Sequence, residues 1–265
     1  MISEILQQLI LGMIQGITEW LPISSSGMTI LVMSNFFGIT NISVLLQQSL
    51  FLHLGTFFAA LIYFRKEVRE LIISIFDKSK SITKKVLIFL IISTIITGII
   101  GIFIMKFLLG NNLELTGKTI TFAIGFLLLI TGGVQLSSGK RGLKNEGDIK
   151  THDSILPGLA QGLAVLPGIS RSGITTSTLL LKKFDDTSAL RLSFLMSLPV
   201  VLLGNIFINL PDITSTFTIA SLLGLLMAFV LGILTIHILM KISKRINFAW
   251  FAIVFAILMM FSVLI

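Results

Sequence analysis

The sequence contains no cysteine and few charged residues for its length. Cysteine is missing from all 265 residues, which excludes disulfide bonds and thiolate metal sites. Charged side chains make up only 12% of the chain, whereas 54% of the residues are hydrophobic and the mean hydropathy is +1.01. A soluble domain of this length needs a polar surface, which this chain lacks the residues to build. The composition therefore predicts a protein with several membrane-spanning segments.

Acidic residues are also scarce, and the net charge is +8. The positions of the basic residues indicate membrane topology rather than nucleic-acid binding. If the loop after Phe64 is cytoplasmic, 17 of the 20 lysines and arginines lie on the cytoplasmic side, as the positive-inside rule requires. This orientation places both termini outside. We therefore expect a multi-pass protein of the plasma membrane.

Six segments are long and apolar enough to cross a hydrocarbon core of about 30 Å as helices. They are approximately Leu46–Phe64, Val86–Phe107, Thr119–Gln135, Leu190–Leu210, Phe217–Met240 and Phe248–Ile265. The loop after the first segment also contains the stretch VRELIISIF, which we interpret as a short helix lying at the membrane interface.

Two further apolar regions, about Ile2–Gly38 and Ser154–Leu181, are each interrupted near the middle by a proline and a run of serine and glycine. A break exposed to lipid would leave backbone N–H and C=O groups without partners, at a cost of several kcal/mol per group. The sequence therefore predicts two re-entrant hairpins, each made of two half-helices whose break faces protein or a wet cavity.

The two interruptions share one pattern. A Gln-Gly pair begins at Gln15 and again at Gln161, and nine residues after each glutamine comes S-x-S-G-x-T, from Ser24 to Thr29 and from Ser170 to Thr175. Each hairpin is followed by three predicted spans. Because a hairpin returns to its own side whereas three spans cross, the second half begins on the opposite face of the membrane. The pattern therefore predicts an inverted repeat.

The predicted fold is all-α, with six transmembrane helices and two re-entrant helical hairpins. We expect a single transmembrane domain over 1–265. Its halves cover about 1–137 and 153–265, and a cytoplasmic loop of about 138–152 joins them.

The first hairpin enters the membrane from outside and the second from the cytoplasm, so their tips should meet near mid-depth. Glu19 lies four residues after Gln15 on the same helix face, and an ionisable group at membrane depth is a functional-site hypothesis by default. Arg171 is the matching cation, and its planar fork suits a carboxylate or a phosphate. A purely structural ion pair between Glu19 and Arg171 is the alternative.

Half-helices that start near Ser25 and Ser172 would direct free backbone N–H groups and positive dipole ends into the same cavity. With an arginine and several hydroxyls, these groups would form an anion site for which phosphate is the natural ligand. Tight helix packing is the alternative explanation for any single serine or glycine. The residues alone leave two classes open: an enzyme acting on a phosphorylated lipid, and a secondary transporter.

The motifs QGITEWLPISSSG and LAVLPGISRSGITTS resemble the two signature motifs of the undecaprenyl-diphosphate phosphatase family, the bacitracin-resistance type. The likeness extends to LHLGTFFAALIYF and LRLSFLMSLPVVLLG. The resemblance implies six spans and two hairpins. It also implies that a polyprenyl diphosphate is hydrolysed at the outer face to the monophosphate and inorganic phosphate, with a divalent cation, Mg²⁺ or Ca²⁺. Such an enzyme recycles the lipid carrier of cell-envelope assembly.

The same resemblance assigns candidate roles. The catalytic candidates are Glu19, Ser25 and Arg171. Ser25 matches the proposed nucleophile, Glu19 would bind a metal ion with Gln15 or help to move a proton, and Arg171 would neutralise charge during phosphoryl transfer. The substrate-binding candidates are Gln15, Ser26, Gly27, Ser170, Ser172, Gly173 and Thr175.

Met28 departs from the family pattern, which has a histidine there. If that histidine is the general acid or base, its loss could cost roughly 10²–10⁴ in rate. For His53, inside the first predicted span, we favour a structural role over a catalytic one. Gln15 in place of glutamate leaves Glu19 as the only carboxylate of the motif.

The leading hypothesis is a polyprenyl-diphosphate phosphatase. The alternative is a polyprenyl-phosphate flippase without hydrolysis, which the inverted symmetry and Met28 favour. The expected partners are the lipid and the membrane, and nucleic acid is excluded. The sequence leaves open whether the chain forms a homodimer, which metal it uses and how long its lipid is.

Overall fold

The computed structural model is built from helices. It describes residues 3–76, 81–110, 117–137, 142–209, 217–242 and 248–263, and no strand occurs within these ranges. The first half contains α1 (Glu4–Thr18), α2 (Ser25–Phe36), α3 (Ile42–Tyr63), α4 (Arg65–Phe76), α5 (Ile82–Gly110) and α6 (Gly117–Ser137). The second contains α7 (Ile155–Leu163), α8 (Arg171–Leu181), α9 (Asp186–Ile208), α11 (Ile219–Ile242) and α12 (Phe248–Ser262), and two short 3₁₀ helices precede it. The predicted all-α class is confirmed.

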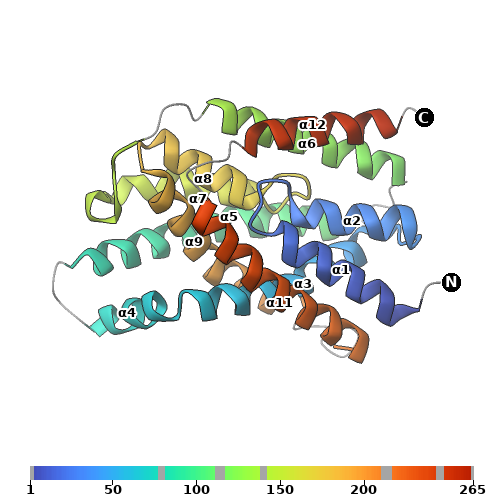
Figure 1. Ribbon diagram of the computed structural model, residues 1–265, viewed down its shortest axis with the longest axis horizontal. Coiled ribbons are helices and arrows are strands. Elements are labelled where there is room, and N and C mark those ends of the chain that lie inside the picture. Colours follow the sequence, from blue (N-terminus) through green and yellow to red (C-terminus); the bar gives the residue numbers. More distant parts are fainter. Residues whose placement is uncertain are drawn as a thin grey trace.

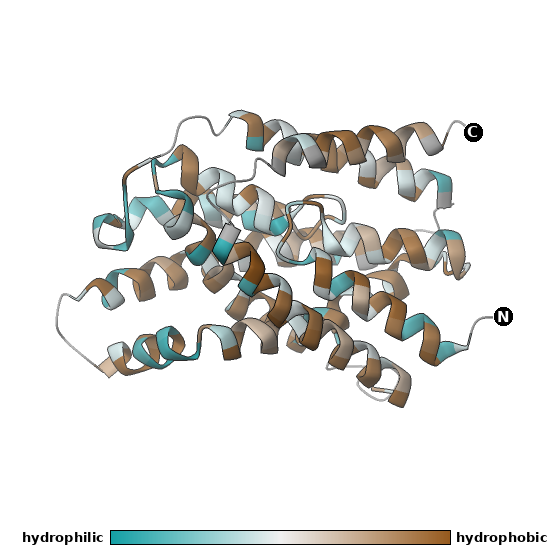
Figure 2. Cartoon of the chain, viewed as in Figure 1, coloured by the Kyte–Doolittle hydropathy of each residue, from teal (hydrophilic) through white to brown (hydrophobic). Residues whose placement is uncertain are grey.

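Five of the helices, α3, α5, α6, α9 and α11, are long and apolar enough to cross a membrane. Hydrophobic residues run along these helices, and hydrophilic residues occur mainly near the two ends of the molecule, including α4, and at a few places in its centre (Figure 2). The chain is therefore a multi-pass membrane protein. The sixth predicted span, Phe248–Ile265, corresponds to the shorter α12, which has 15 residues. Leu264 and Ile265, like Ile2 and Leu210 at the ends of other predicted segments, lie outside the described residues.

Each interrupted apolar region folds as two helices with a break between them. Residues 19–24 separate α1 from α2, and residues 164–170 separate α7 from α8. The second helix of each pair begins with the same cap. The Ser24 hydroxyl accepts a hydrogen bond from the Gly27 backbone N–H, and the Ser170 hydroxyl accepts one from that of Gly173, both at 3.3 Å. A serine in this position satisfies a backbone donor that the helix leaves free.

The packing of the hairpins is crossed, in the sense that each hairpin lies against a long helix of the other half of the chain. The first helix of the first hairpin, α1, lies against α11 of the second half, and α7 lies against α5 of the first half. The start of α1 and the end of α12 lie at one end of the molecule, and α4 lies at the other (Figure 1). This interlocking brings the breaks of the two hairpins into the centre of the protein. The inverted orientation of the halves and their boundaries stay predictions, and residues 138–141 of the predicted connecting loop lie outside the described residues.

Glycine permits the close contact between α1 and α11. A Cβ atom added at Gly12 would lie 2.1 Å from the backbone oxygen of Gly224, and one added at Gly16 would lie 2.8 Å from that of Ala228. Any larger side chain must therefore push α1 away from α11. Because α1 ends immediately before Glu19, this contact also fixes the position of the first break along α11.

We therefore predict that Gly12→Ala lowers the free energy of unfolding by about 1–3 kcal/mol through overpacking. Gly133→Ala in α6 is the matched control, because nothing lies within 4 Å of its added Cβ. This control should be neutral, or stabilising by up to about 1 kcal/mol through helix propensity. Thermal unfolding of the two purified variants in detergent measures the difference, and equal changes would contradict the close contact.

Candidate active site

The breaks of the two hairpins touch each other. The Ser24 hydroxyl accepts a hydrogen bond from the backbone N–H of Gly168 at 2.9 Å, and the Ser172 hydroxyl donates to the Leu21 carbonyl at 3.0 Å. Ser24 adopts a left-handed backbone conformation with φ of 63°, which costs a residue other than glycine of the order of 1 kcal/mol. Its hydroxyl links both loops, so the junction holds this conformation. The predicted contact between the two chain breaks is confirmed, and their depth in the membrane stays a prediction.

The predicted ion pair lies at this junction. Arg171 Nη2 donates to Glu19 Oε1 at 2.5 Å, and the two side chains are 13% and 3% exposed. Arg171 Nη1 also donates to the Ser193 carbonyl at 3.3 Å, and its guanidinium lies 5.8 Å from the centre of the Trp20 ring. These contacts fix the position of the guanidinium beside the first hairpin.

Glu19 is the centre of a wider hydrogen-bond network. Its Oε2 accepts a hydrogen bond from Gln15 Nε2 at 2.8 Å and another from the Ser25 hydroxyl at 2.6 Å. His53 Nε2 lies 3.2 Å from the same oxygen and 3.4 Å from the Ser25 hydroxyl. A serine, an imidazole and a carboxylate within mutual reach form the arrangement by which proteins activate a nucleophile.

The sequence favours a structural role for His53 over a catalytic one and does not place it in this network. Its position beside Ser25 and Glu19 makes a catalytic role equally open to test. Its Nδ1 lies 2.7 Å from the Ser49 carbonyl. A carbonyl only accepts, so Nδ1 carries a proton and Nε2 faces the serine and the carboxylate. The signal was present in the sequence, because Ser49, His53 and Thr56 follow one face of an otherwise apolar helix at spacings of four and three.

Met28 does not reach this network. Its side chain is 8% exposed and packs in an apolar cluster that includes Leu11, Ile30 and Leu128. The helix α2 therefore brings Ser25 to the site and directs Met28 into the core. The imidazole near Ser25 comes from α3 instead.

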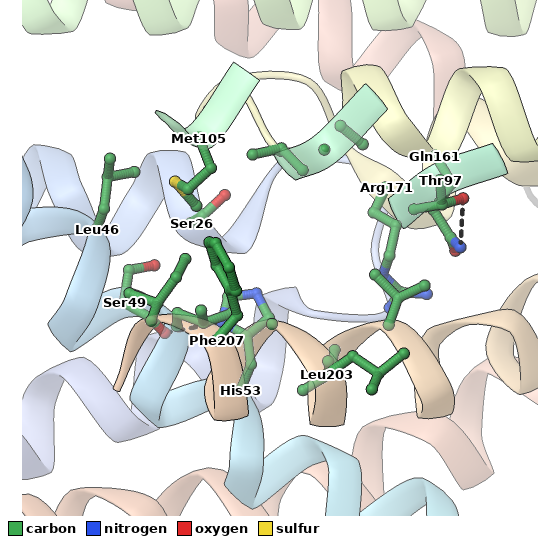
Figure 3. Close-up of a pocket in the computed structure, with 18 of the residues that line it drawn as sticks. Ser26, Leu46, Ser49, His53, Thr97, Met105, Gln161, Arg171, Leu203 and Phe207 are labelled. Carbon is green, nitrogen blue, oxygen red and sulfur yellow. Dashed lines mark hydrogen bonds between the residues drawn. The ribbon is translucent and has the colours of Figure 1, made fainter. Parts of the chain in front are cut away.

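The network faces a cavity of about 670 Å³. Its polar lining from the two hairpins consists of Glu19, Ser24, Ser25, Ser26, Gln161, Ser170 and Arg171. Its apolar lining includes Leu46 and Leu50 from α3, Ile102 and Met105 from α5, and Leu203 and Phe207 from α9. Figure 3 draws Arg171 at one end of the view, and Leu46 and Met105 together with Ser26 and Ser49 at the other. The cavity therefore has a charged end at Arg171, and the rest of its lining is mostly apolar.

The remaining predicted substrate-binding residues do not line the cavity. They are Gln15, Gly27, Ser172, Gly173 and Thr175. Their contacts support the loops instead: a Cβ at Gly173 would lie 2.9 Å from Pro22, and the Thr175 hydroxyl bonds that of Ser193 at 2.6 Å. Only Ser26 and Ser170 of that set reach the cavity.

The described ranges offer few side chains that could bind the divalent cation expected from the sequence. They contain no group of three or more His, Cys, Asp or Glu side chains that could hold a metal ion. Of the carboxylates that the structure describes, Glu19 alone lines the cavity, and Gln15 does not line it. Mg²⁺ is commonly bound by one or two carboxylates together with substrate phosphates. Glu19 fits that role as a single protein ligand.

A family model and several named relatives match nearly the whole chain. The family model described as bacitracin resistance protein BacA matches residues 8–261. A Methanococcoides burtonii protein named undecaprenyl-diphosphatase is 44% identical, over 96% of this chain and 98% of the relative. Proteins of that name from Methanothrix thermoacetophila and Haloarcula marismortui are 37% and 35% identical, over 94% and 93% of this chain and 93% and 92% of the relatives.

The ion pair generates a stability prediction. Arg171→Ala leaves Glu19 as an unpaired buried charge, which should lower the free energy of unfolding by about 3–5 kcal/mol. Adding Glu19→Gln removes that charge and should recover most of the loss. Chemical unfolding of the single and double variants in detergent measures both values. Equal destabilisation of the two variants would show that the unpaired Glu19 charge costs nothing, which would contradict the prediction.

Proposed function

Because this chain belongs to the bacitracin resistance protein BacA family, we propose that it hydrolyses undecaprenyl diphosphate to undecaprenyl phosphate and inorganic phosphate, and so recycles a lipid carrier. One observation carries the proposal: Glu19, Ser25 and Arg171 converge at the charged end of a largely apolar cavity. A substrate with a diphosphate head and an isoprenoid tail matches both parts of that cavity.

The tail has a path out of the cavity between α5 and α9. The apolar lining side chains Ile102, Leu203 and Phe207 are 42%, 54% and 45% exposed. Gly98 of α5 and Gly204 of α9 also line the cavity and leave space beside them. A Cβ at Gly98 would meet nothing within 4 Å, and one at Gly204 would meet only Leu50, at 3.7 Å. Burying an isoprenoid chain against these side chains is favourable, and its far end would continue into the bilayer.

In the proposed reaction, the Ser25 oxygen attacks the terminal phosphorus. Its proton leaves to the Glu19–His53 pair, because the Ser25 hydroxyl donates to Glu19 at 2.6 Å and lies 3.4 Å from the imidazole. The bond from the terminal phosphorus to the bridging oxygen breaks, and undecaprenyl phosphate leaves. Water then attacks the phosphoserine and gives a proton to the same pair, and the proton taken earlier from Ser25 returns to the Ser25 oxygen as its bond to phosphorus breaks. Inorganic phosphate is released and the serine hydroxyl is restored. Arg171 neutralises the charge on the phosphoryl oxygens.

A divalent cation is part of this proposal. Glu19 would contact it together with the phosphates of the substrate, and the ion would supply further neutralisation of the diphosphate charge. Gln15 acts on Glu19 instead, since its amide donates to the carboxylate at 2.8 Å.

The topology expected from the sequence also belongs to this proposal: six spans, two re-entrant hairpins and both termini outside. The apolar lining residues Leu46, Met105 and Phe207 lie toward the start of α3 and the ends of α5 and α9. In the expected orientation these helix ends are the outer ones, opposite the basic α4. The cavity would therefore open at the outer face.

The flippase alternative does not account for Ser25. A carrier needs an anion site, but it has no use for a serine placed between a carboxylate and an imidazole. We predict that purified protein releases phosphate from undecaprenyl diphosphate in the presence of Mg²⁺, and that Ser25→Ala lowers kcat at least about 10²-fold. Vesicle translocation of undecaprenyl phosphate without any phosphate release would instead support the flippase.

His53 and Met28 provide a paired prediction. His53→Ala should lower kcat roughly 10²–10⁴-fold with a small effect on KM, because it removes the imidazole near Ser25. Met28→His should not raise kcat, because this side chain points into the apolar core. Steady-state kinetics on both variants test the assignment. A large gain in kcat from Met28→His, with no loss of kcat from His53→Ala, would instead assign the imidazole's role to position 28.

A further inference from the structure

A second polar cluster lines the cavity on the side of α5 and α7, away from Ser25. Gln161 is only 2% exposed, yet its Oε1 has no hydrogen-bond partner among the described residues. The hydroxyl of Thr94 is also buried without a partner there. Both residues line the cavity. Neither belongs to the network around Glu19.

The orientation of Gln161 is fixed by its other end. Its Nε2 donates to the Thr97 hydroxyl at 3.2 Å and to the Met196 carbonyl at 3.5 Å. The Thr97 hydroxyl itself donates to the Gly158 carbonyl at 3.0 Å. Both contacts require the amide nitrogen of Gln161, rather than its oxygen, to face Thr97 and Met196. The free oxygen of Gln161 can therefore only accept a hydrogen bond, whereas the free hydroxyl of Thr94 can donate one.

Buried polar atoms without partners are rare, because each forfeits its hydration on folding. Three other buried side-chain atoms without partners in the described part of the chain belong to Gln15, Thr176 and Asn209. None of these three residues lines the cavity. Gln161 and Thr94 do line it, from the neighbouring helices α7 and α5. Together they offer one hydrogen-bond acceptor and one donor, which matches an anion that carries a hydroxyl group.

The position of the cluster relative to the lipid path indicates what it would contact. Thr97 and Gln161 are drawn at the same end of the cavity as Arg171, whereas Leu46 and Met105 lie at the opposite end (Figure 3). A lipid whose tail occupies the apolar end directs its terminal phosphate toward Arg171 and Gln161. The terminal phosphate is also the group that hydrolysis releases.

We propose that Thr94 and Gln161 form a subsite for the released inorganic phosphate, an inference that rests on the proposed hydrolysis. The Thr94 hydroxyl donates to a phosphate oxygen. The Gln161 carbonyl oxygen accepts from a P–OH group, which free phosphate retains at neutral pH. Sulfate has the same shape and carries no such proton at this pH. A site built to hydrogen-bond a hydroxyl discriminates strongly against an analogue without it.

The test compares phosphate with sulfate as inhibitors of undecaprenyl diphosphate hydrolysis. For the wild-type protein we expect the inhibition constant of phosphate to be at least about tenfold lower than that of sulfate. Thr94→Val should raise the phosphate constant about tenfold through loss of a hydrogen bond to a charged group. Gln161→Leu should bring the phosphate and sulfate constants together.

Thr176→Val is the matched control, because the hydroxyl of Thr176 is also buried without a partner in the described structure but lies outside the cavity. It should leave both inhibition constants unchanged. Equal inhibition of the wild-type protein by the two anions, or equal shifts in Thr94→Val and Thr176→Val, would overturn the subsite.

Direct calorimetric titration of the proteins with phosphate and sulfate separates the subsite from the reaction. Selective phosphate binding that is lost in Thr94→Val and Gln161→Leu supports the subsite even if no lipid is hydrolysed, in which case the proposed function alone fails. Hydrolysis without any selective phosphate binding refutes the subsite and leaves the function standing.

Discussion

The structure depends on one buried ion pair, between Glu19 of the first hairpin and Arg171 of the second. Each charge alone would be costly at membrane depth, and each becomes tolerable because the other is within hydrogen-bond distance. The pair can form only if both chain breaks reach the same point. The crossed packing of α1 on α11 and of α7 on α5 brings them there. A phosphate can replace the carboxylate as the partner of Arg171, since the guanidinium binds both.

The two repeated motifs make matching hydrogen bonds but present different side chains to the site. Ser24 and Ser170 cap equivalent helices, and the threonine of each motif bonds a serine hydroxyl of the following long helix, Thr29 to Ser49 and Thr175 to Ser193. The residue after each capping serine differs: it is Ser25 in one motif and Arg171 in the other. Equivalent positions thus present a serine hydroxyl and a guanidinium to the same carboxylate. The two motifs share their capping and threonine hydrogen bonds, and the side chains in which they differ create the site.

The cavity accounts for the choice of an amphiphilic substrate. Its charged end is small and buried, whereas its apolar lining reaches side chains such as Leu203 and Phe207 that are about half exposed. A soluble phosphate ester would leave that lining without a partner, and an ordinary hydrocarbon would leave Arg171 without an anion. A lipid diphosphate satisfies both, because its head and its tail have opposite requirements for burial.

The sequence by itself determined the all-helical membrane class, the two interrupted regions and the candidates Glu19, Ser25 and Arg171, because hydropathy and motif spacing are local properties of the chain. Only the tertiary structure decided that His53 lies beside Ser25 whereas Met28 faces the core, and that Gln161 lines the cavity whereas Gln15 does not. These outcomes depend on how each helix is rotated against its neighbours. Spacing along one helix shows which residues share a face, but packing between helices sets what that face contacts.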